Sequence, residues 1–273
     1  MKKILAMILA VMMLATCLVA CGGEDKESAT KVAVQKGTTS LMYAQVLKGA
    51  KAVSYDTFAL AANDMKNGNA DYVFVDKTTA KALCKEIAGI KMIDIALSSE
   101  NYGIGIDPNQ ASLKTQIDAV LTNKADEINA IKDKYMNGEE DKYVGITSAV
   151  KDVNRAAEQL VVATNAEFAP WEYKEGNKYY GIDMEIAQLI ATELGLELVI
   201  DDMDFDMVVG AVGKQCVDIA MSGITITAER MNVVNFSIPY YTEAIVVVCK
   251  EDDTSLDSVG TVVDLLNVIC KAN

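Results

Sequence analysis

The chain has 273 residues, of which 51% are hydrophobic and 23% are charged, as expected for a folded protein of one or two domains. Its formal net charge of −14 argues against a nucleic-acid partner, because an acidic surface repels phosphate groups. The chain has no histidine, so it lacks the usual base of a nucleophilic site and the commonest metal ligand. We therefore expect no metal site, no cofactor and no bound nucleic acid.

The first thirty residues have the form of an export signal followed by a tether. Residues 1–20 begin with MKK and continue as an apolar run, which is typical of a secretory signal peptide. An uncleaved membrane anchor is the alternative, since the run approaches spanning length. The stretch LVAC (18–21) resembles a bacterial lipobox, which implies cleavage before Cys21 and lipidation of its thiol. Residues 21–30 would then tether an extracytoplasmic protein to the cell membrane.

Four cysteines lie beyond the signal and the lipidation site, and none of them forms a C-x-x-C pair: Cys84, Cys216, Cys249 and Cys270. This spacing argues against a zinc site. Export would permit disulfides, but the irregular spacing favours free or buried thiols.

Strands and helices alternate through the first part of the chain. Strands are predicted at 31–35, 51–56, 71–76 and 102–107, and helices at 39–49, 57–68, 78–89, 111–123 and 125–136. Apolar strands separated by amphipathic helices indicate βαβ units and parallel sheets that are covered on both faces. Residues 137–159 are polar and are predicted to be a linker with a short helix.

The alternation resumes at residue 160. Strands are predicted at 160–165, 196–201, 218–223 and 243–250, and helices at 182–195, 206–213 and 256–269. No sequence repeat of 20–50 residues is present. The pattern predicts an α/β protein with two blocks joined by a linker.

The stretch QKGTTS (35–40) predicts a tight turn between a strand and a helix. Gly37 permits close backbone approach, and Thr38 and Thr39 place hydroxyl and N–H groups at the start of the helix. Such a position favours a carboxylate or a phosphate. In isolation, a threonine before a helix is more often only an N-cap.

A second polar stretch, SGITITAER (222–230), follows another apolar strand. Gly223 leaves its backbone open to a ligand, Thr225 supplies a hydroxyl, and Arg230 can form two parallel hydrogen bonds to one carboxylate. The alternative for Arg230 is an ordinary exposed arginine. Asp76 ends an apolar strand, where its carboxylate can receive an ammonium group or can cap the next helix.

Three aromatic residues lie at or beside predicted strand-to-helix connections: Phe168, Trp171 and Phe205. In open α/β sheets this edge faces the ligand, and aromatic rings there can pack against a small molecule. Hydrophobic core is the alternative for each of them, and first of all for Trp171. An arginine, an aspartate, helix-start amides and aromatic faces together suit a zwitterion.

These motifs carry a family resemblance. Residues 160–241, with TNAEFAPWEY, MDFD and SGITITAERMNVVNFSIPYY, resemble the first lobe of the polar amino-acid-binding proteins of ABC importers, bacterial extracellular solute-binding protein family 3. Residues 32–136, with VAVQKGTTS and DYVFVD, resemble the second lobe and the closing helices. The resemblance implies a two-lobed periplasmic-binding-protein type II fold.

The order of the two parts is the reverse of the family's order, which indicates a circular permutation. Lobe 2 would consist of residues 31–101 plus 251–273, and lobe 1 of residues 108–243. Residues 137–159 would join the family's usual termini, and the strands 102–107 and 244–250 would form the hinge. A broken, non-functional remnant is the competing interpretation, although each expected motif is present once.

The resemblance also implies a role for each motif residue. Arg230 and Thr225, with backbone N–H groups near Thr38 and Thr39, would hold the α-carboxylate of the ligand. Asp76 and the Gly223 carbonyl would receive the α-ammonium group. Four further residues would surround the ligand side chain: Phe168 and Phe205 as flanking rings, and Gln35 and Asn165 at positions where relatives choose among side chains. Many relatives that bind glutamine or basic amino acids have an aspartate in place of Asn165.

The function implied is that of a monomeric, lipid-anchored solute-binding protein, not an enzyme, that delivers an amino acid to an ABC permease. One alternative is an enzyme on the same scaffold, since a few relatives resemble dehydratases of small carboxylic acids. Such an enzyme needs a general acid or base, and Glu167 is the extra carboxylate to consider. Another alternative is a ligand sensor for a surface receptor.

Overall fold

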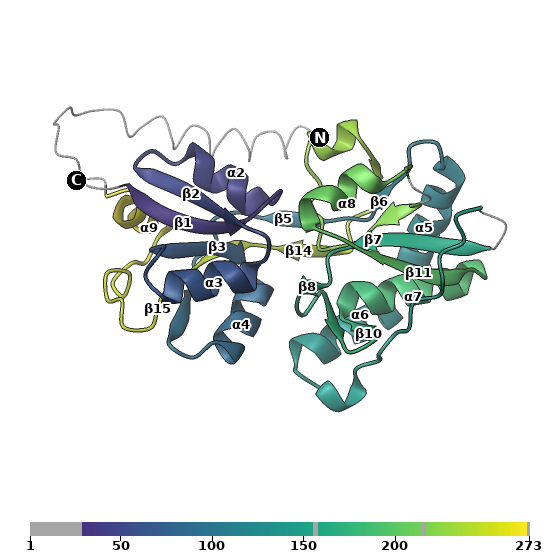
Figure 1. Ribbon diagram of the computed structural model, residues 1–273, viewed down its shortest axis with the longest axis horizontal. Helices are drawn as coiled ribbons and strands as arrows, with labels where there is room; N and C mark the ends of the chain where they lie inside the picture. Colours follow the sequence, from purple (N-terminus) through teal and green to yellow (C-terminus); the bar gives the residue numbers. More distant parts are fainter. Residues whose placement is uncertain (1–28, 155–157, 215–216, 272–273) are drawn as a thin grey trace.

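The computed structural model describes residues 29–154, 158–214 and 217–271, and in it the chain forms two α/β lobes (Figure 1). This confirms the fold class and the two-lobed arrangement predicted from the sequence. The expected signal peptide, Cys21 and most of the tether lie outside the described residues. Within the described part, no helix has the length and apolar character that crossing a membrane requires.

Lobe 2 contains residues from both ends of the described chain, 30–97 and 244–271. Its sheet has the strand order β2-β1-β3-β15-β4, with the bounds β1 Thr30–Gln35, β2 Ala50–Tyr55, β3 Tyr72–Asp76, β4 Ile90–Ile93 and β15 Ile245–Lys250. Its helices are α2 Thr39–Val46, α3 Phe58–Lys66, α4 Lys77–Glu86 and α9 Val262–Ile269. β1 pairs in parallel with β2 and β3, whereas β15 is antiparallel to both of its neighbours.

Lobe 1, residues 103–240, has a sheet of order β11-β7-β12-β6-β13. The bounds are β6 Gly105–Ile106, β7 Gln159–Thr164, β11 Glu197–Asp202, β12 Ile219–Ala220 and β13 Asn235–Phe236. A smaller antiparallel sheet contains β8 Glu167–Phe168, β9 Glu172–Glu175 and β10 Lys178–Tyr180. The helices are α5 Ala111–Asn123, α6 Ala125–Met136, α7 Ile182–Leu194 and α8 Phe205–Ala211, with short 3₁₀ turns η1 Glu140–Lys142 and η2 Arg230–Asn232.

The two main sheets share one plan. In lobe 2, β1 lies between β2 and β3, and in lobe 1, β7 lies between β11 and β12; each set of three strands is parallel. The strand beside each set, β15 in lobe 2 and β6 in lobe 1, is antiparallel and follows directly from a strand that connects the lobes. The carboxyl ends of the parallel strands are the edge at which α/β proteins bind ligands. Because this edge of each sheet faces the other lobe, loops from both lobes meet.

The strands that connect the lobes differ from those expected. The connection is made by β5 (Glu100–Tyr102) and β14 (Tyr241–Glu243), which pair antiparallel between the lobes (Figure 1). The expected hinge strand 244–250 instead lies in the middle of the lobe 2 sheet as β15, and the strand expected at 102–107 is divided between β5 and β6. The reason is that β15 is an apolar run buried along almost its whole length, which requires cover on both faces.

Helix starts follow threonine caps more closely than they follow the apolar pattern. Thr38, Thr57 and Thr261 each accept a hydrogen bond from a backbone N–H three residues later, at 3.2 Å. The helix expected at 256–269 therefore begins only at Val262. The cap positions matter for the site, because Thr38 and Thr57 start α2 and α3, whose first turns lie toward lobe 1.

Trp171 joins lobe 1 to the hinge and to lobe 2. Its side chain has no exposed surface and packs against the rings of Tyr102 at 4.9 Å and Tyr241 at 4.7 Å, measured between ring centroids. Its Nε1–H donates to the Thr78 hydroxyl of α4 at 2.9 Å, and that hydroxyl donates to the Glu243 carboxylate on β14. The residue is core, as the sequence suggested, but it is the core of the junction between the lobes.

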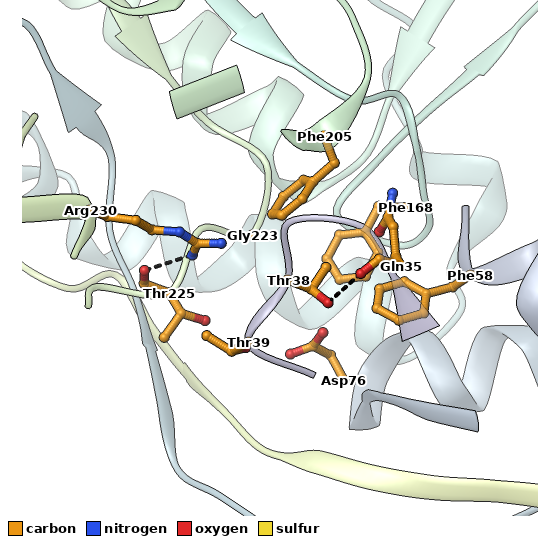
Figure 2. Close-up of a pocket in the computed structure, with 10 residues that line it drawn as sticks. All are labelled: Gln35, Thr38, Thr39, Phe58, Asp76, Phe168, Phe205, Gly223, Thr225 and Arg230. Carbon is orange, nitrogen blue, oxygen red and sulfur yellow. Dashed lines mark hydrogen bonds between the residues drawn. The ribbon is translucent and has the colours of Figure 1, made fainter. Parts of the chain in front are cut away.

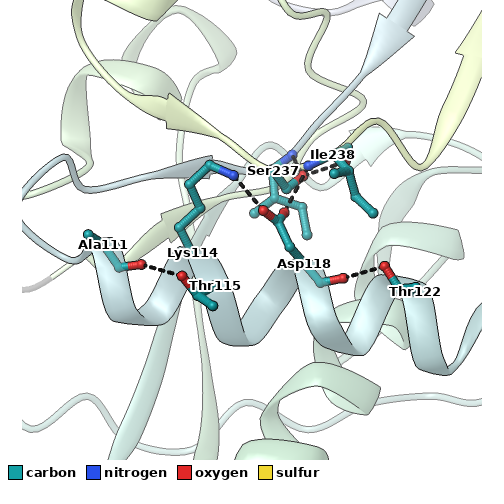
Figure 3. A network of polar contacts seen from close by, with 8 residues as sticks. Ala111, Lys114, Thr115, Asp118, Thr122, Ser237 and Ile238 are labelled. Carbon is teal, nitrogen blue, oxygen red and sulfur yellow. Dashed lines mark hydrogen bonds and ion pairs between the residues drawn. The ribbon is translucent and has the colours of Figure 1, made fainter.

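A polar network holds the segment that leads from β13 back to the hinge (Figure 3). The Asp118 carboxylate of α5 accepts a hydrogen bond from the Ile238 N–H at 2.8 Å and also pairs with Lys114. One residue earlier, the Ser237 hydroxyl accepts from the Ile104 N–H at 3.0 Å. These contacts fix the direction in which the chain leaves lobe 1.

We predict that Trp171→Ala lowers the free energy of unfolding by about 3–5 kcal/mol, because a buried aromatic ring is lost. Trp171→Phe keeps most of the ring volume but loses the donor to Thr78, at a cost of about 1 kcal/mol. Urea denaturation followed by far-ultraviolet circular dichroism measures both. The control is Val150→Ala at a 90% exposed position, which should change stability by less than about 0.5 kcal/mol. An alanine variant as stable as this control would contradict the role of Trp171.

Candidate functional site

A small cavity lies where the loops of the two lobes meet (Figure 2). Residues of both lobes line it: Gln35, Thr38, Thr39, Phe58, Asp76, Phe168, Phe205, Gly223, Thr225 and Arg230. Nine of the ten residues predicted from the sequence to bind a ligand are among them. The tenth, Asn165, lies beside the cavity and is bonded to Gln35.

The turn after β1 brings the start of α2 to the cavity. The Thr38 hydroxyl donates to the Gln35 carbonyl at 2.7 Å and accepts from the Leu41 N–H at 3.2 Å, so it is occupied as the helix cap. The backbone N–H groups of the first helical turn are donors of the kind that suits an anion. Gly37 has a φ of +72°, and a Cβ at this position would lie 2.9 Å from the Asp206 Cα of lobe 1. A glycine is therefore required where this turn touches α8.

Arg230 supplies the positive charge of the cavity and touches both lobes. One guanidinium nitrogen donates to the Thr225 carbonyl of lobe 1 at 2.8 Å, and the other donates to the Gly37 carbonyl of lobe 2 at 3.0 Å. The guanidinium also lies 5.6 Å from the centroid of the Phe205 ring. Among the described residues, no carboxylate lies within ion-pair distance of Arg230.

Two opposing influences act on the pKa of Arg230. Burial lowers the pKa of the guanidinium, and the negative charge of Glu100, with that of Asp76 when it is ionised, opposes this shift. An arginine still remains charged in a protein. The site therefore presents a cation whose fork of donors is held only by neutral carbonyl groups.

Asp76 is the carboxylate of the cavity and lies at the end of β3. Although it immediately precedes α4, its side chain makes no capping hydrogen bond to that helix, so the capping alternative is not realised. Its side chain is 6% exposed. Burial, reinforced by the charges of Glu243 and Glu100, raises its pKa from 3.8 to about 8, while the neighbouring Tyr102 hydroxyl opposes the shift. The carboxyl group is thus mostly protonated at neutral pH unless a cation approaches it.

Gly223 brings lobe 1 backbone to the cavity wall. Its φ is +52°, and a Cβ there would lie 2.7 Å from the Phe168 ring. Its N–H donates to the Asp183 carboxylate at 2.8 Å, and that carboxylate also accepts from the Tyr240 hydroxyl at 2.8 Å. With the N–H held by a buried carboxylate, the carbonyl is the backbone group that Gly223 can offer to a ligand.

Aromatic rings form the apolar part of the cavity, and one of them was missed by the sequence analysis. Phe58 lies 5.7 Å from Phe168 between ring centroids, with the rings tilted by 32°. Phe58 is the first residue of α3, which follows β2, and Phe205 is the first residue of α8, which follows β11. β2 and β11 occupy the same place in their two sheets. The shared plan of the sheets was thus the signal that could have identified Phe58.

An amide pair bridges the lobes beside the rings. The Gln35 Nε2 donates to the Asn165 Oδ1 at 2.9 Å and to the Asp56 carbonyl at 2.8 Å, and the Asn165 Nδ2 donates to the Met203 carbonyl at 3.0 Å. Gln35 ends β1 and Asn165 follows β7, the strands that occupy the same place in the two sheets. Both side chains are almost completely buried.

Other chemistry considered from the sequence lies away from this cavity. Glu167 is exposed and does not line it. Cys84, Cys249 and Cys270 are free thiols, whereas Cys216 lies outside the described residues. In the described part of the chain, no group of cysteine and acidic side chains is arranged to hold a metal ion.

Comparison with known proteins gives a family match for part of the chain. Residues 160–272 match the model of the bacterial extracellular solute-binding proteins, family 3. The chain is 40% identical over 94 residues to the arginine-binding extracellular protein ArtP of Bacillus subtilis, covering 34% of this chain and 37% of ArtP. It is 39% identical over 82 residues to the cyclohexadienyl dehydratase of Pseudomonas aeruginosa, covering 30% and 31%. Residues 160–272 are thus similar to part of this solute-binding family, and each alignment spans less than half of the relative's length.

Solved structures give two further similarities. The arginine-bound domain 1 of TmArgBP is 30% identical, with a TM-score of 0.30, covering 45% of this chain and 98% of that domain. The glutamate-bound ligand-binding core of GluR0 is 11% identical, with a TM-score of 0.48, covering 90% of this chain and 97% of that one.

We predict that Asp76 titrates near pH 8 in the ligand-free protein, being protonated below that pH and ionised above it. Glu243→Gln should lower this pKa, because it removes a neighbouring negative charge from a buried site. Carbon-13 NMR of the aspartate side-chain carboxyl groups measures the titration. The exposed Glu175→Gln variant is the control and should leave it unchanged. A midpoint near pH 4 for Asp76 would contradict the electrostatic account of the cavity.

Proposed function

We propose that this protein is a lipid-anchored solute-binding protein that captures an amino acid between its lobes and delivers it to an ABC permease. The observation that carries the proposal is that one cationic side chain and one carboxyl group line the same cavity between the lobes. Arg230 comes from lobe 1 and Asp76 from lobe 2. An α-amino acid carries the complementary pair, a carboxylate and an ammonium group, on one carbon atom.

Arg230 is assigned to the ligand carboxylate. Its donors now reach the carbonyls of Thr225 and Gly37, and a carboxylate would accept the same fork in stronger, charge-assisted bonds. The N–H groups at the start of α2, near Thr38 and Thr39, supply a second positive region from lobe 2. The carboxylate would thereby connect the lobes.

Asp76 is assigned to the ligand ammonium group, together with the Gly223 carbonyl. An ammonium group near the buried carboxyl favours its ionised form, so binding is coupled to the loss of a proton from Asp76. Below pH 8 this proton must be removed before the charged pair can form. The affinity therefore rises with pH up to about 8 and falls on acidification.

Closure of the lobes follows from this division of contacts. A ligand shifts a conformational equilibrium only if it interacts differently with the two states. Here its carboxylate and ammonium groups each need both lobes, which only the closed arrangement brings together. The narrow connection of β5 and β14 is the place where the lobes can rotate relative to one another.

The proposals of a membrane anchor and of a permease partner rest on the sequence and on similar proteins. The LVAC stretch before Cys21 resembles a lipobox, and several similar proteins are named as amino-acid-binding proteins, among them the ABC transporter arginine-binding protein 1 of Escherichia coli, 30% identical over 98 residues. The similarity to a dehydratase keeps an enzyme as the alternative. Because Glu167 is exposed and lies outside the cavity, we favour a binding protein over an enzyme.

We predict that Arg230→Ala abolishes amino-acid binding. A thermal-shift screen of the mature protein against the common amino acids identifies the ligand, which raises the unfolding midpoint by mass action. Calorimetry should then show a loss of affinity of about a hundredfold or more, since two bonds to a charged group are worth about 1.5–3 kcal/mol each. The control is Lys91→Ala, whose side chain pairs with Asp257 on lobe 2 outside the cavity. Unchanged affinity in the Arg230 variant would refute the assignment, and product formation from the ligand would identify an enzyme instead.

We also propose that the chain is a circular permutant of the family fold. Lobe 2 is built from both ends of the described chain, and these ends meet. The Thr30 N–H donates to the Gly49 carbonyl at 3.0 Å, and a Cβ on Gly49 would lie 2.4 Å from the Cys270 carbonyl oxygen. Adjacent ends at the side of lobe 2 away from the cavity are what a permuted chain requires.

We predict that restoring the family order preserves the fold. The variant joins residue 271 to residue 30 through a short flexible linker and places the new ends within 150–158. This segment includes exposed positions such as Val150 and Val153, which is where new termini are tolerated. Thermal unfolding and ligand calorimetry should give values close to those of the original chain. A rearranged chain that fails to fold while the original folds would contradict the permutation.

A further inference from the structure

Tyr102 carries a buried hydroxyl group to which the proposed ligand contacts assign no role. The residue ends β5, one of the two strands that connect the lobes, and it does not line the cavity itself. On the basis of the proposed function, we infer that Tyr102 is a positioning residue: its hydroxyl donates to the ionised carboxylate of Asp76 and so prepares Asp76 to receive the ammonium group of the ligand. Two observations carry this inference, the missing hydrogen-bond partner of the hydroxyl and the rigid placement of the ring.

The Tyr102 hydroxyl is buried without a hydrogen-bond partner. The side chain is 0% exposed, and within the described part of the chain its oxygen makes no hydrogen bond of ordinary geometry. Buried polar groups are rarely left in this state. Burial and the negative charge of Asp76 raise the pKa of this hydroxyl well above its usual value, so it remains a donor throughout the range in which Asp76 titrates. An ionised Asp76 would supply the acceptor that the hydroxyl lacks.

Two buried carboxylates of the connecting strands act on Asp76 in the opposite direction. Glu100 of β5 and Glu243 of β14 lie directly opposite one another in the strand pair, and each is 5% exposed. Burial raises the pKa of Asp76, and these two negative charges add to the effect, whereas the Tyr102 hydroxyl lowers it. Glu100 also favours the charged form of Arg230, more strongly than Asp76 does. Tyr102 is thus a neutral group on the connecting strands that stabilises the ionised form of Asp76.

The ring of Tyr102 is held by contacts on several sides. Its backbone pairs with Tyr241 of β14 on one side and forms a bridge with Thr225 of the cavity wall on the other. A Cβ on Gly223 would lie 3.1 Å from the Tyr102 ring, and the Trp171 ring packs edge-on against it at 4.9 Å between centroids. Because the side chain is already ordered, a new hydrogen bond from its hydroxyl requires no further loss of conformational freedom.

This placement relates the carboxylate of lobe 2 to the connection between the lobes. Asp76 ends β3 of lobe 2, whereas Thr225, to which Tyr102 is bridged, belongs to lobe 1. The Tyr240 hydroxyl also acts on Tyr102, but it donates to the Asp183 carboxylate at 2.8 Å and so does not compete for Asp76. The Tyr102 hydroxyl and the ammonium group of the ligand therefore favour the same ionised form of Asp76.

The first test uses the ligand-free protein. Tyr102→Phe removes only the hydroxyl and should raise the pKa of Asp76 above its value of about 8 in the original chain, whereas Glu243→Gln should move it in the opposite direction. Carbon-13 NMR of the aspartate carboxyl groups measures both. The control is Tyr72→Phe, because the Tyr72 hydroxyl lies 3.2 Å from that of Ser255 on lobe 2, outside the ligand cavity. A midpoint in Tyr102→Phe equal to or below that of the original chain would overturn the inference.

The second test measures affinity by calorimetry at two pH values, with the amino acid that gives the largest thermal shift in the screen. At pH 7, Tyr102→Phe should bind it at least about tenfold more weakly, because without the hydroxyl Asp76 is protonated in more of the molecules. At about pH 9.5 the loss should shrink to less than about threefold, since Asp76 is then ionised in most molecules of both proteins. An equal loss at both pH values would indicate a purely structural role and would overturn the inference.

The unmodified protein provides a check that does not depend on how the variant folds. In a crystal structure with the same amino acid bound, the Tyr102 hydroxyl oxygen should lie about 2.5–2.7 Å from an Asp76 carboxylate oxygen. A separation above about 3.5 Å would overturn the inference. If no amino acid binds at all, the proposed function fails, while the NMR titration still decides whether Tyr102 acts on Asp76.

Discussion

The contact of the Arg230 guanidinium with both lobes is the interaction on which the site depends. A partly buried cation that donates to the Gly37 carbonyl of one lobe and the Thr225 carbonyl of the other lacks an anionic partner in the described structure. Burial makes its charge costly and therefore makes an incoming carboxylate valuable. Two other features of the cavity complement this cation. Asp76 provides a carboxyl group, and the aromatic rings limit the space.

The fold places these groups by applying one sheet plan twice. Both sheets direct the carboxyl ends of their parallel strands toward the cavity, so Gln35 after β1 meets Asn165 after β7, and Phe58 at the start of α3 lies near Phe168 of lobe 1. Glycines with positive φ allow the close approaches that this meeting needs, at Gly37 against α8 and at Gly223 against Phe168. The junction of Trp171, Thr78 and Glu243 then ties both lobes to the connecting strands.

The sequence predicted the parts of this arrangement that local chemistry determines. Alternating apolar strands and amphipathic helices predicted the α/β class, and the threonine and glycine turns predicted which loops line the cavity. The hinge was misplaced by a few residues, because a buried apolar run such as Ile245–Lys250 looks the same from the sequence whether it crosses between lobes or fills a sheet. Phe58 and the Gln35–Asn165 bond depend on contacts between distant segments, which no short motif displays.

We propose that one amino acid lies between Arg230 and Asp76 and holds the lobes together. A crystal structure of the mature protein with its tightest-binding amino acid tests this most directly. We expect the α-carboxylate to bind the Arg230 guanidinium in place of the Gly37 carbonyl, and the α-ammonium group to bind Asp76. A ligand bound outside this cavity, or one bound while Arg230 keeps its present carbonyl partners, would contradict it.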